Sequence, residues 1–199
     1  MPLPLPSIER KRMHLRSVRL EGFKRVDGLW EVEARLVDTK DQDYALPSGV
    51  VRPGEPVHDM YVRITIDGQF NILQAIASTD AAPYMGACEA IAPDYSKIVG
   101  LNLFHGFLKA VKERFGGIHG CAHVTELLMS LPTAALQTYA SEVLESGMSE
   151  HKPYPLDRCH ALVSDSEVVK RYYPRWYRQK SAEPRHSLDS PSSPREESA

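Results

Sequence analysis

Residues 57–78, VHDMYVRITIDGQFNILQAIAS, decide the fold of this chain. Asp67-Gly68 lies between two runs that resemble strands, and Asp-Gly is a strong hairpin signal because a type I′ turn needs positive φ at both central residues. The first run alternates as a strand with one buried face does. Its apolar side holds Met60, Val62, Ile64 and Ile66, and its polar side holds Tyr61, Arg63 and Thr65. We therefore expect a hairpin with strands over 57–66 and 69–78.

An earlier segment follows the same logic. Residues 13–26 and 29–38 flank Asp27-Gly28. Apolar and polar positions again alternate, with Trp30, Val32, Ala34 and Leu36 opposite Glu31, Glu33 and Arg35. Two hairpins predict an antiparallel sheet of four strands with one face covered. The proline- and glycine-rich segment between them, about 41–56, is expected to be a loop.

The periodicity changes to a helical one after residue 80. We expect a short helix over 84–99 with a break near Pro93, a helix over 102–115, and a helix over 121–146 that Pro132 kinks or restarts. The stretch 159–178 has two readings: a strand at 161–163, and a short helix or an aromatic cap at 168–177. Strands followed by helices predict an α+β fold with the helices packed on one face of the sheet.

The composition is that of an ordinary globular protein: 199 residues, 42% apolar and 25% charged, with a net charge of −2. We expect an extended arm over 1–11, a single domain over 12–180 and a disordered Ser/Pro/Glu-rich tail over 181–199. No apolar run is long enough for a membrane helix, and no secretory signal is evident, which favours a cytoplasmic protein. The 24 basic and 26 acidic residues exclude the charge footprint of a nucleic-acid-binding protein. Neither nucleic acid nor membrane is an expected partner.

The densest group of metal-binding side chains lies at the predicted start of the last long helix, where Cys121 stands between His119 and His123. A helix N-terminus lowers the pKa of a thiol, and thiolate with imidazole suits zinc or an iron–sulfur centre. If the helix begins at Gly120, Cys121 and His123 differ by about 200° around its axis. Both can face one ion only if Cys121 belongs to the loop, so we expect Cys121 plus one histidine. The plain alternative is a loop glycine beside surface histidines.

Other candidate ligands lie at element boundaries: Cys88, His58, Asp59, Asp80, Cys159 and His160. Each has a plainer interpretation. Cys88 can be a buried core thiol, His58-Asp59 a solvated pair, and Asp80 a helix cap. Adjacent residues on a strand point to opposite faces, so at most one of Cys159 and His160 reaches a given site. Three cysteines are too few for a disulfide framework, which predicts reduced thiols.

Five segments resemble a bacterial family of uncharacterised proteins that is known only as a domain of unknown function. They are residues 24–30 (KRVDGLW), 36–40 (LVDTK), 54–60 (GEPVHDM), 120–128 (GCAHVTELL) and 159–162 (CHAL). This resemblance supports the domain boundaries and implies no chemistry.

Residues 55–140 also resemble the iron–sulfur scaffold family of IscU and the N-terminal part of NifU. There a Pro-x-Cys-Gly-Asp segment opens a strand, a small-residue turn ends in Cys, and a His-Cys pair opens a later helix. The corresponding segments here are 56–60, 84–88 and 119–123. The resemblance implies a site made of His58 with Asp59, Cys88, and Cys121 with His119 or His123.

This chain departs from the scaffold pattern in three ways. His58 replaces the first scaffold cysteine, the glycine before the aspartate is missing, and the final pair is spaced differently. Two thiolates, one imidazole and a carboxylate or second imidazole suit zinc better than a standard cluster. Mixed Cys/His ligation still holds a two-iron cluster in Rieske centres, so both cofactors stay open.

Three functions follow as hypotheses. The first is a zinc or iron–sulfur scaffold or carrier that serves a metalloenzyme or other protein partner, with Asp59 as a ligand or as the group that keeps the site exchangeable. The second is a zinc-dependent hydrolase or lyase acting on a small metabolite, with Asp59, Asp80 or Glu126 as general base. The third is a non-catalytic interaction module with buried thiols, in which the aromatic segment 172–177 (YYPRWY) forms a contact patch.

Overall fold

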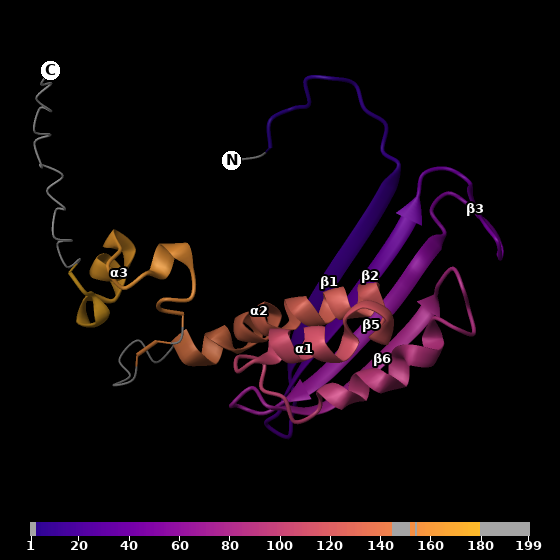
Figure 1. Ribbon diagram of the computed structural model, residues 1–199. Coiled ribbons are helices and arrows are strands. Elements are labelled where there is room, and N and C mark those ends of the chain that lie inside the picture. Colours follow the sequence, from indigo (N-terminus) through magenta and orange to yellow (C-terminus); the bar gives the residue numbers. More distant parts are fainter. Residues whose placement is uncertain (1–2, 145–151, 154, 180–199) are drawn as a thin grey trace, which may run out of the picture. The chain divides into compact units, whose positions relative to one another are not determined.

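The computed structural model describes residues 3–144, 152–153 and 155–179 (Figure 1). The chain divides into two compact units, Met1–Glu142 and Val143–Ala199. The single domain expected over 12–180 stays a prediction. Among the described residues of the second unit, the buried apolar side chains are Leu156 and Val169. The expected tail over 181–199 lies outside the described residues.

The first unit is built on a four-stranded antiparallel sheet with the order β1-β2-β5-β6. Its strands are β1 (His14–Lys24), β2 (Trp30–Lys40), β5 (Pro56–Ile66) and β6 (Ile72–Ala81). Both predicted hairpins are thereby confirmed.

The turns of the two hairpins differ from the expected type I′ geometry. Gly28 has a φ of 85°, but neither Asp27 nor Asp67 is among the described residues with positive φ, and Phe70 has a φ of 65° instead. The Asp67 carboxylate accepts hydrogen bonds from the backbone N–H groups of Gln69 and Asn71, at 2.9 Å each. These bonds stabilise a longer loop than the two-residue turn that Asp-Gly suggests.

The segment between the hairpins is not the plain loop that was expected. It contains a two-stranded antiparallel pair, β3 (Tyr44–Leu46) and β4 (Gly49–Val51). Tyr44, Val50 and Val51 have high strand propensity, and Pro47-Ser48 supplies the turn between them. The prolines and glycines around these short strands favour a loop in a prediction from sequence, although the runs themselves form strands.

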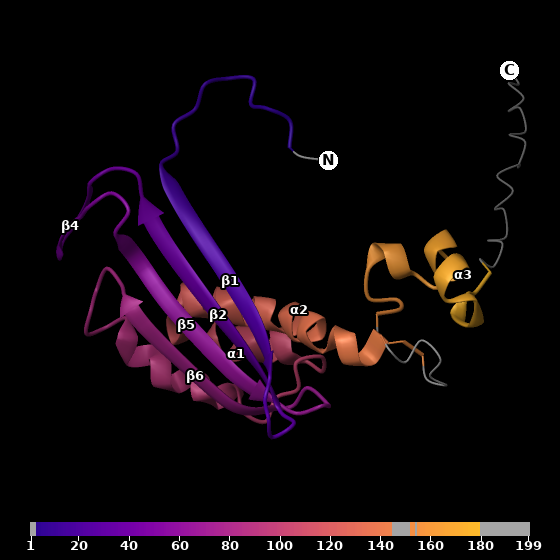
Figure 2. The same cartoon turned by 180° about the vertical axis from the view of Figure 1, so that it is seen from behind.

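Helices cover one face of the sheet, as predicted for an α+β fold (Figures 1 and 2). They are the 3₁₀ helix η1 (Glu89–Ile98), α1 (Phe107–Phe115), the 3₁₀ turn η2 (Gly117–His119) and α2 (Ala122–Leu144). Pro93 lies inside η1, and Pro132 lies inside α2 without ending it. Residues 102–106 precede α1 instead of belonging to it, because Asn102 forms isolated bridges with Asn71 and Gly106.

The apolar sides of the strands and helices meet in one core. The side chains predicted from strand alternation are buried with those on the inward sides of η1, α1 and α2; among them are Trp30, Val32, Leu36, Met60, Val62, Ile64, Tyr95, Phe107, Val111, Leu127 and Leu131. Gly22 of β1 lets α2 approach closely, since an added Cβ there would lie 1.7 Å from Thr138 Oγ1. The opposite face carries cross-strand ion pairs such as Arg35–Asp59 and Arg63–Glu33.

The second unit contains η3 (His160–Leu162), α3 (Glu167–Tyr172) and η4 (Pro174–Trp176). The prediction of a strand at 161–163 is wrong, because the 3₁₀ turn η3 occupies residues 160–162. Asp157, with a φ of 62°, accepts hydrogen bonds from the backbone N–H and hydroxyl of Ser164 and holds the chain in a tight turn. Across both units, none of the described helices has the length and apolar character needed to cross a membrane.

Candidate metal site

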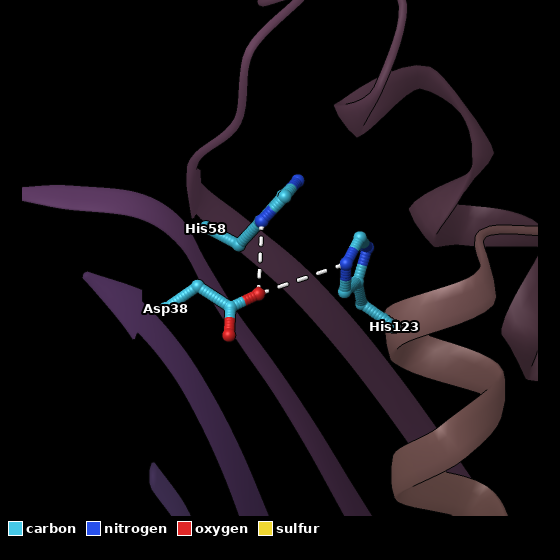
Figure 3. A group of neighbouring side chains, drawn as sticks. All are labelled: Asp38, His58 and His123. Atoms are coloured by element: carbon cyan, nitrogen blue, oxygen red, sulfur yellow. Dashed lines mark hydrogen bonds and ion pairs between the residues drawn. The ribbon is translucent and has the colours of Figure 1, made fainter. Parts of the chain in front are cut away.

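Asp38 of β2, His58 of β5 and His123 of α2 converge at one end of the first unit (Figure 3). Each offers one ligand atom, and these three atoms all lie within 4.8 Å of one another. Asp38 Oδ2 lies 3.0 Å from His58 Nδ1 and 3.7 Å from His123 Nε2. We call this group the Asp–His–His site.

Strand register brings the first two residues together. Asp38 and His58 are directly opposite each other in the β2–β5 pair. Each also lies two positions from a buried apolar residue, Leu36 in β2 and Met60 in β5, so both side chains point to the helix-covered face. The first turn of α2 then places His123 next to Asp38 and His58.

Asp38 is held in place by two further side chains from β1. Arg16 donates from Nε to Oδ1 and from Nη2 to Oδ2, at 2.8 Å each, and His14 Nε2 lies 2.8 Å from Oδ1. The carboxylate is almost fully buried, with 3% exposure. Burial alone would raise the pKa of Asp38, but the hydrogen bonds from Arg16 and His14 outweigh it and hold the pKa well below its usual range. The group is therefore ionised at neutral pH.

Both imidazoles are neutral at the same pH. Burial lowers the pKa of His58 and of His123 below the usual value, and the neighbouring Asp38 only partly offsets that effect. The two rings lie 3.8 Å apart with a tilt of 31°. Their side chains retain 18% and 24% exposure, so solvent still reaches them. An ionised carboxylate with two neutral imidazoles is the protonation state in which these groups bind a metal.

The two separations that involve Asp38 suit a single small divalent ion. Two ligand atoms that each lie about 2.0–2.1 Å from a tetrahedral zinc ion are about 3.3 Å apart. The 3.0 Å and 3.7 Å separations from Asp38 Oδ2 bracket that value. With the metal in place, Arg16 and His14 would continue to orient the carboxylate, as outer hydrogen-bond partners do in zinc proteins.

Comparison with known proteins identifies the family of the chain. A family model described as a protein of unknown function, DUF2889, matches residues 14–137. The chain belongs to the DUF2889 family. No curated protein and no solved structure matches it, so the IscU-like character of residues 55–140 stays a prediction. All three residues of the Asp–His–His site lie within the DUF2889 match, and the described residues of the second unit lie outside it.

Of the residues predicted from sequence, the DUF2889 domain brings His58 and His123 together. Cys121 lies in the loop directly before α2, which is the arrangement that the sequence analysis required for it to approach His123. Its Sγ is 3.9 Å from His123 Nδ1, which is the ring nitrogen that does not face Asp38. Among the described residues, Cys121 is not part of the group that shares one ion position.

The remaining predicted ligands lie apart from this group. Asp59 points to the opposite face of the sheet and receives two hydrogen bonds from Arg35, at 2.7 and 2.8 Å. Asp80 is exposed and lines a pocket of about 320 Å³ on that face. Cys88 directly precedes η1, His119 is exposed in η2, and Cys159 and His160 are exposed in the second unit. None of these six belongs to a three-residue ligand group in the described structure.

Asp38 is the site residue that sequence reasoning missed, although a signal for it exists. The apolar series in β2 advances by two from Trp30 to Leu36, and Asp38 is its next member. A carboxylate at the end of a buried series is rarely left without partners. The same alternation excludes Asp59, which has the parity of Tyr61 and Arg63 on the opposite face of the sheet.

Proposed function

We propose that this DUF2889 domain binds a divalent metal ion, zinc in the first place, through Asp38, His58 and His123. The observation that supports this proposal most directly is the set of three ligand atoms within 4.8 Å, drawn from three different elements of the fold. The carboxylate is ionised and the imidazoles are neutral, so no large protonation cost opposes binding.

A zinc ion fits this ligand set better than an iron–sulfur cluster does. Clusters are held by several cysteine thiolates, and even Rieske centres keep two. Among the described residues, no cysteine joins the Asp–His–His site. Two imidazoles and one carboxylate are ligands of catalytic zinc and also of non-haem iron(II), so iron(II) is the competing ion in any binding test.

Three protein ligands leave a fourth position of a tetrahedral zinc ion open. A ligand from a partner protein can occupy that position during transfer, and we propose a carrier that transfers the ion to a protein partner. One observation favours a hydrolase as the second candidate. Glu126 lies one turn after His123 on α2 and is linked through Arg16 to Asp38. Zinc lowers the pKa of bound water to about 7, and in a hydrolase Glu126 would be the general base.

Zinc affinity tests the proposal. Metal-free protein is titrated with zinc in competition with a chromophoric chelator at neutral pH. We expect one tight site, weakened on the order of 100-fold in His58→Gln, because a ligand is lost. His119→Gln is the matched control and should bind zinc as the parent does, since His119 is exposed and outside the site. Equal affinities for His58→Gln and the parent would exclude this site.

Carrier and hydrolase are separated by a second measurement. The zinc-loaded protein is assayed with a panel of activated esters and with a metal-free zinc enzyme as acceptor. Turnover that a chelator abolishes, and that Glu126→Gln loses at unchanged zinc affinity, supports the hydrolase. Zinc transfer to the acceptor that is faster than dissociation into buffer supports the carrier.

A further inference from the structure

A second group of donor atoms lies on the other side of the His123 ring. Cys121 Sγ is 3.7 Å from Met60 Sδ and 3.9 Å from His123 Nδ1. The ring thus presents Nε2 to Asp38 and Nδ1 to a pair of sulfur atoms. We call Met60, Cys121 and His123 the Met–Cys–His group.

The sulfur atoms of this group are held by the fold. Met60 follows His58 by two positions on the inward face of β5 and is 1% exposed. Cys121 is fixed through its backbone, because its N–H donates to the Tyr95 hydroxyl at 2.8 Å and its carbonyl accepts from that hydroxyl at 3.0 Å. Tyr95 is itself fully buried. The backbone of Cys121, from which Sγ projects, is therefore held by the core and not by a mobile surface loop.

We propose that the Met–Cys–His group is a site for copper(I). Thiolate, thioether and imidazole are soft or borderline donors, and thiolate with thioether selects copper(I) over harder ions. The separations of Cys121 Sγ from the other two donor atoms suit a three-coordinate ion. Metal–sulfur and metal–nitrogen bonds of about 2.3 and 2.0 Å in a trigonal plane put the donors about 3.7–4.0 Å apart. The two observed separations are 3.7 and 3.9 Å.

Charge discriminates between the two ions at this position. Copper(I) replaces the thiol proton of Cys121, which is released to solvent, and the resulting thiolate and monovalent ion are together neutral. A neutral centre is tolerated beside the buried Met60, whereas zinc with one thiolate would leave a net positive charge in the same apolar surroundings. Copper remains in the same oxidation state throughout, so no electron donor is needed.

Copper(I) affinity tests this inference on the full chain. Zinc-free protein is titrated anaerobically with copper(I) in competition with bicinchoninate. We expect one copper(I) per chain, with affinity reduced on the order of 100-fold in Met60→Leu and in Cys121→Ser. Leucine nearly conserves the volume of methionine, so Met60→Leu should fold. Met129→Leu and Cys88→Ser are matched controls, since neither residue belongs to the group, and both should bind copper(I) as the parent does.

The two metal proposals fail separately. His58→Gln should weaken zinc and leave copper(I) unchanged, Met60→Leu should do the reverse, and His123→Gln should weaken both. Sulfur scatterers in the copper X-ray absorption spectrum, reduced in Met60→Leu, support the assignment independently of affinity. Parent-like copper(I) affinity in folded Met60→Leu, or an equal loss in Cys88→Ser, would overturn it whatever the zinc titration shows.

Discussion

Replacing Gly22 with alanine should separate α2 from the sheet. The added Cβ would lie 1.7 Å from Thr138 Oγ1, 2.4 Å from Cγ2 and 2.5 Å from Thr138 Cβ. Rotating the threonine side chain cannot relieve the last contact, because Cβ is fixed to the helix backbone. Carbon atoms pack at about 3.5–4.0 Å, so the helix and β1 must move apart by about 1 Å.

The expected cost is at the upper end of the range for overpacking. Extra methyl groups forced into a packed core destabilise by about 1–3 kcal/mol, and here the obstacle is a helix and not a flexible side chain. We expect a loss of about 3 kcal/mol in the free energy of unfolding, which lowers Tm by about 10 °C for a unit of this size. Since α2 carries His123, the same displacement should weaken zinc binding.

Chemical and thermal unfolding measure this effect. Gly68→Ala is the matched control, because a Cβ at Gly68 would meet Tyr139 Oη at an ordinary 3.8 Å. Its stability should be unchanged or slightly higher, as a glycine outside the positive-φ region allows. Thr138→Gly in the Gly22→Ala background should recover part of the loss, even though glycine costs about 1 kcal/mol in a helix. Equal stabilities for Gly22→Ala and Gly68→Ala would refute the reasoning.

Three further outcomes are expected. All three groups of the Asp–His–His site have pKa values below their ordinary ones, so the folded state binds fewer protons than the unfolded chain does. The stability of the metal-free protein should therefore fall as the pH drops below about 6.5, where imidazoles of the unfolded chain protonate, and again below about 4, where its carboxylates do. A urea midpoint that rises on acidification would contradict this. Asp59→Asn should leave zinc affinity unchanged despite its position beside His58, which chelator competition checks against His58→Gln. Tyr95→Phe should lose about 1–3 kcal/mol in urea unfolding, because the Cys121 N–H loses its buried acceptor, whereas Tyr139→Phe should be near neutral.

The fold was largely predictable because its signals are local. Strand alternation located both hairpins and their buried faces, and helical spacing located α1 and α2. The errors arose where tertiary contacts override local propensity. Of the two expectations for Pro132, a restart of the helix is wrong, because α2 continues through the proline, with Leu131 and Ala135 buried on either side of it. The 161–163 run has strand propensity, but the Asp157–Ser164 hydrogen bonds impose a turn.

The site was predictable only in part, because it depends on strand register. Sequence motifs drew attention to His58 and His123, but motif proximity says nothing about which face a strand residue occupies. Adjacency in the sequence suggests that His58 and Asp59 share one site, although successive strand residues point to opposite faces of the sheet. Asp38 was overlooked because its partner is opposite it in β5 and not adjacent in the chain. Cys88 is a candidate because it lies at an element boundary, and the scaffold resemblance adds to this, but neither signal says which other side chains lie near it.

The order in which the three proposed ligands occur in the chain bears on when the proposed site could form during biosynthesis. Asp38 and His58 leave the ribosome together with the hairpins that pair them, whereas His123 follows only after β6, η1 and α1 have been synthesised. Domains fold as their residues emerge, so a nascent chain that ends before α2 holds two ligands and an unfinished site. The three side chains can therefore come together only after the start of α2 has left the ribosome, and prematurely terminated products that lack α2 would lack the complete site.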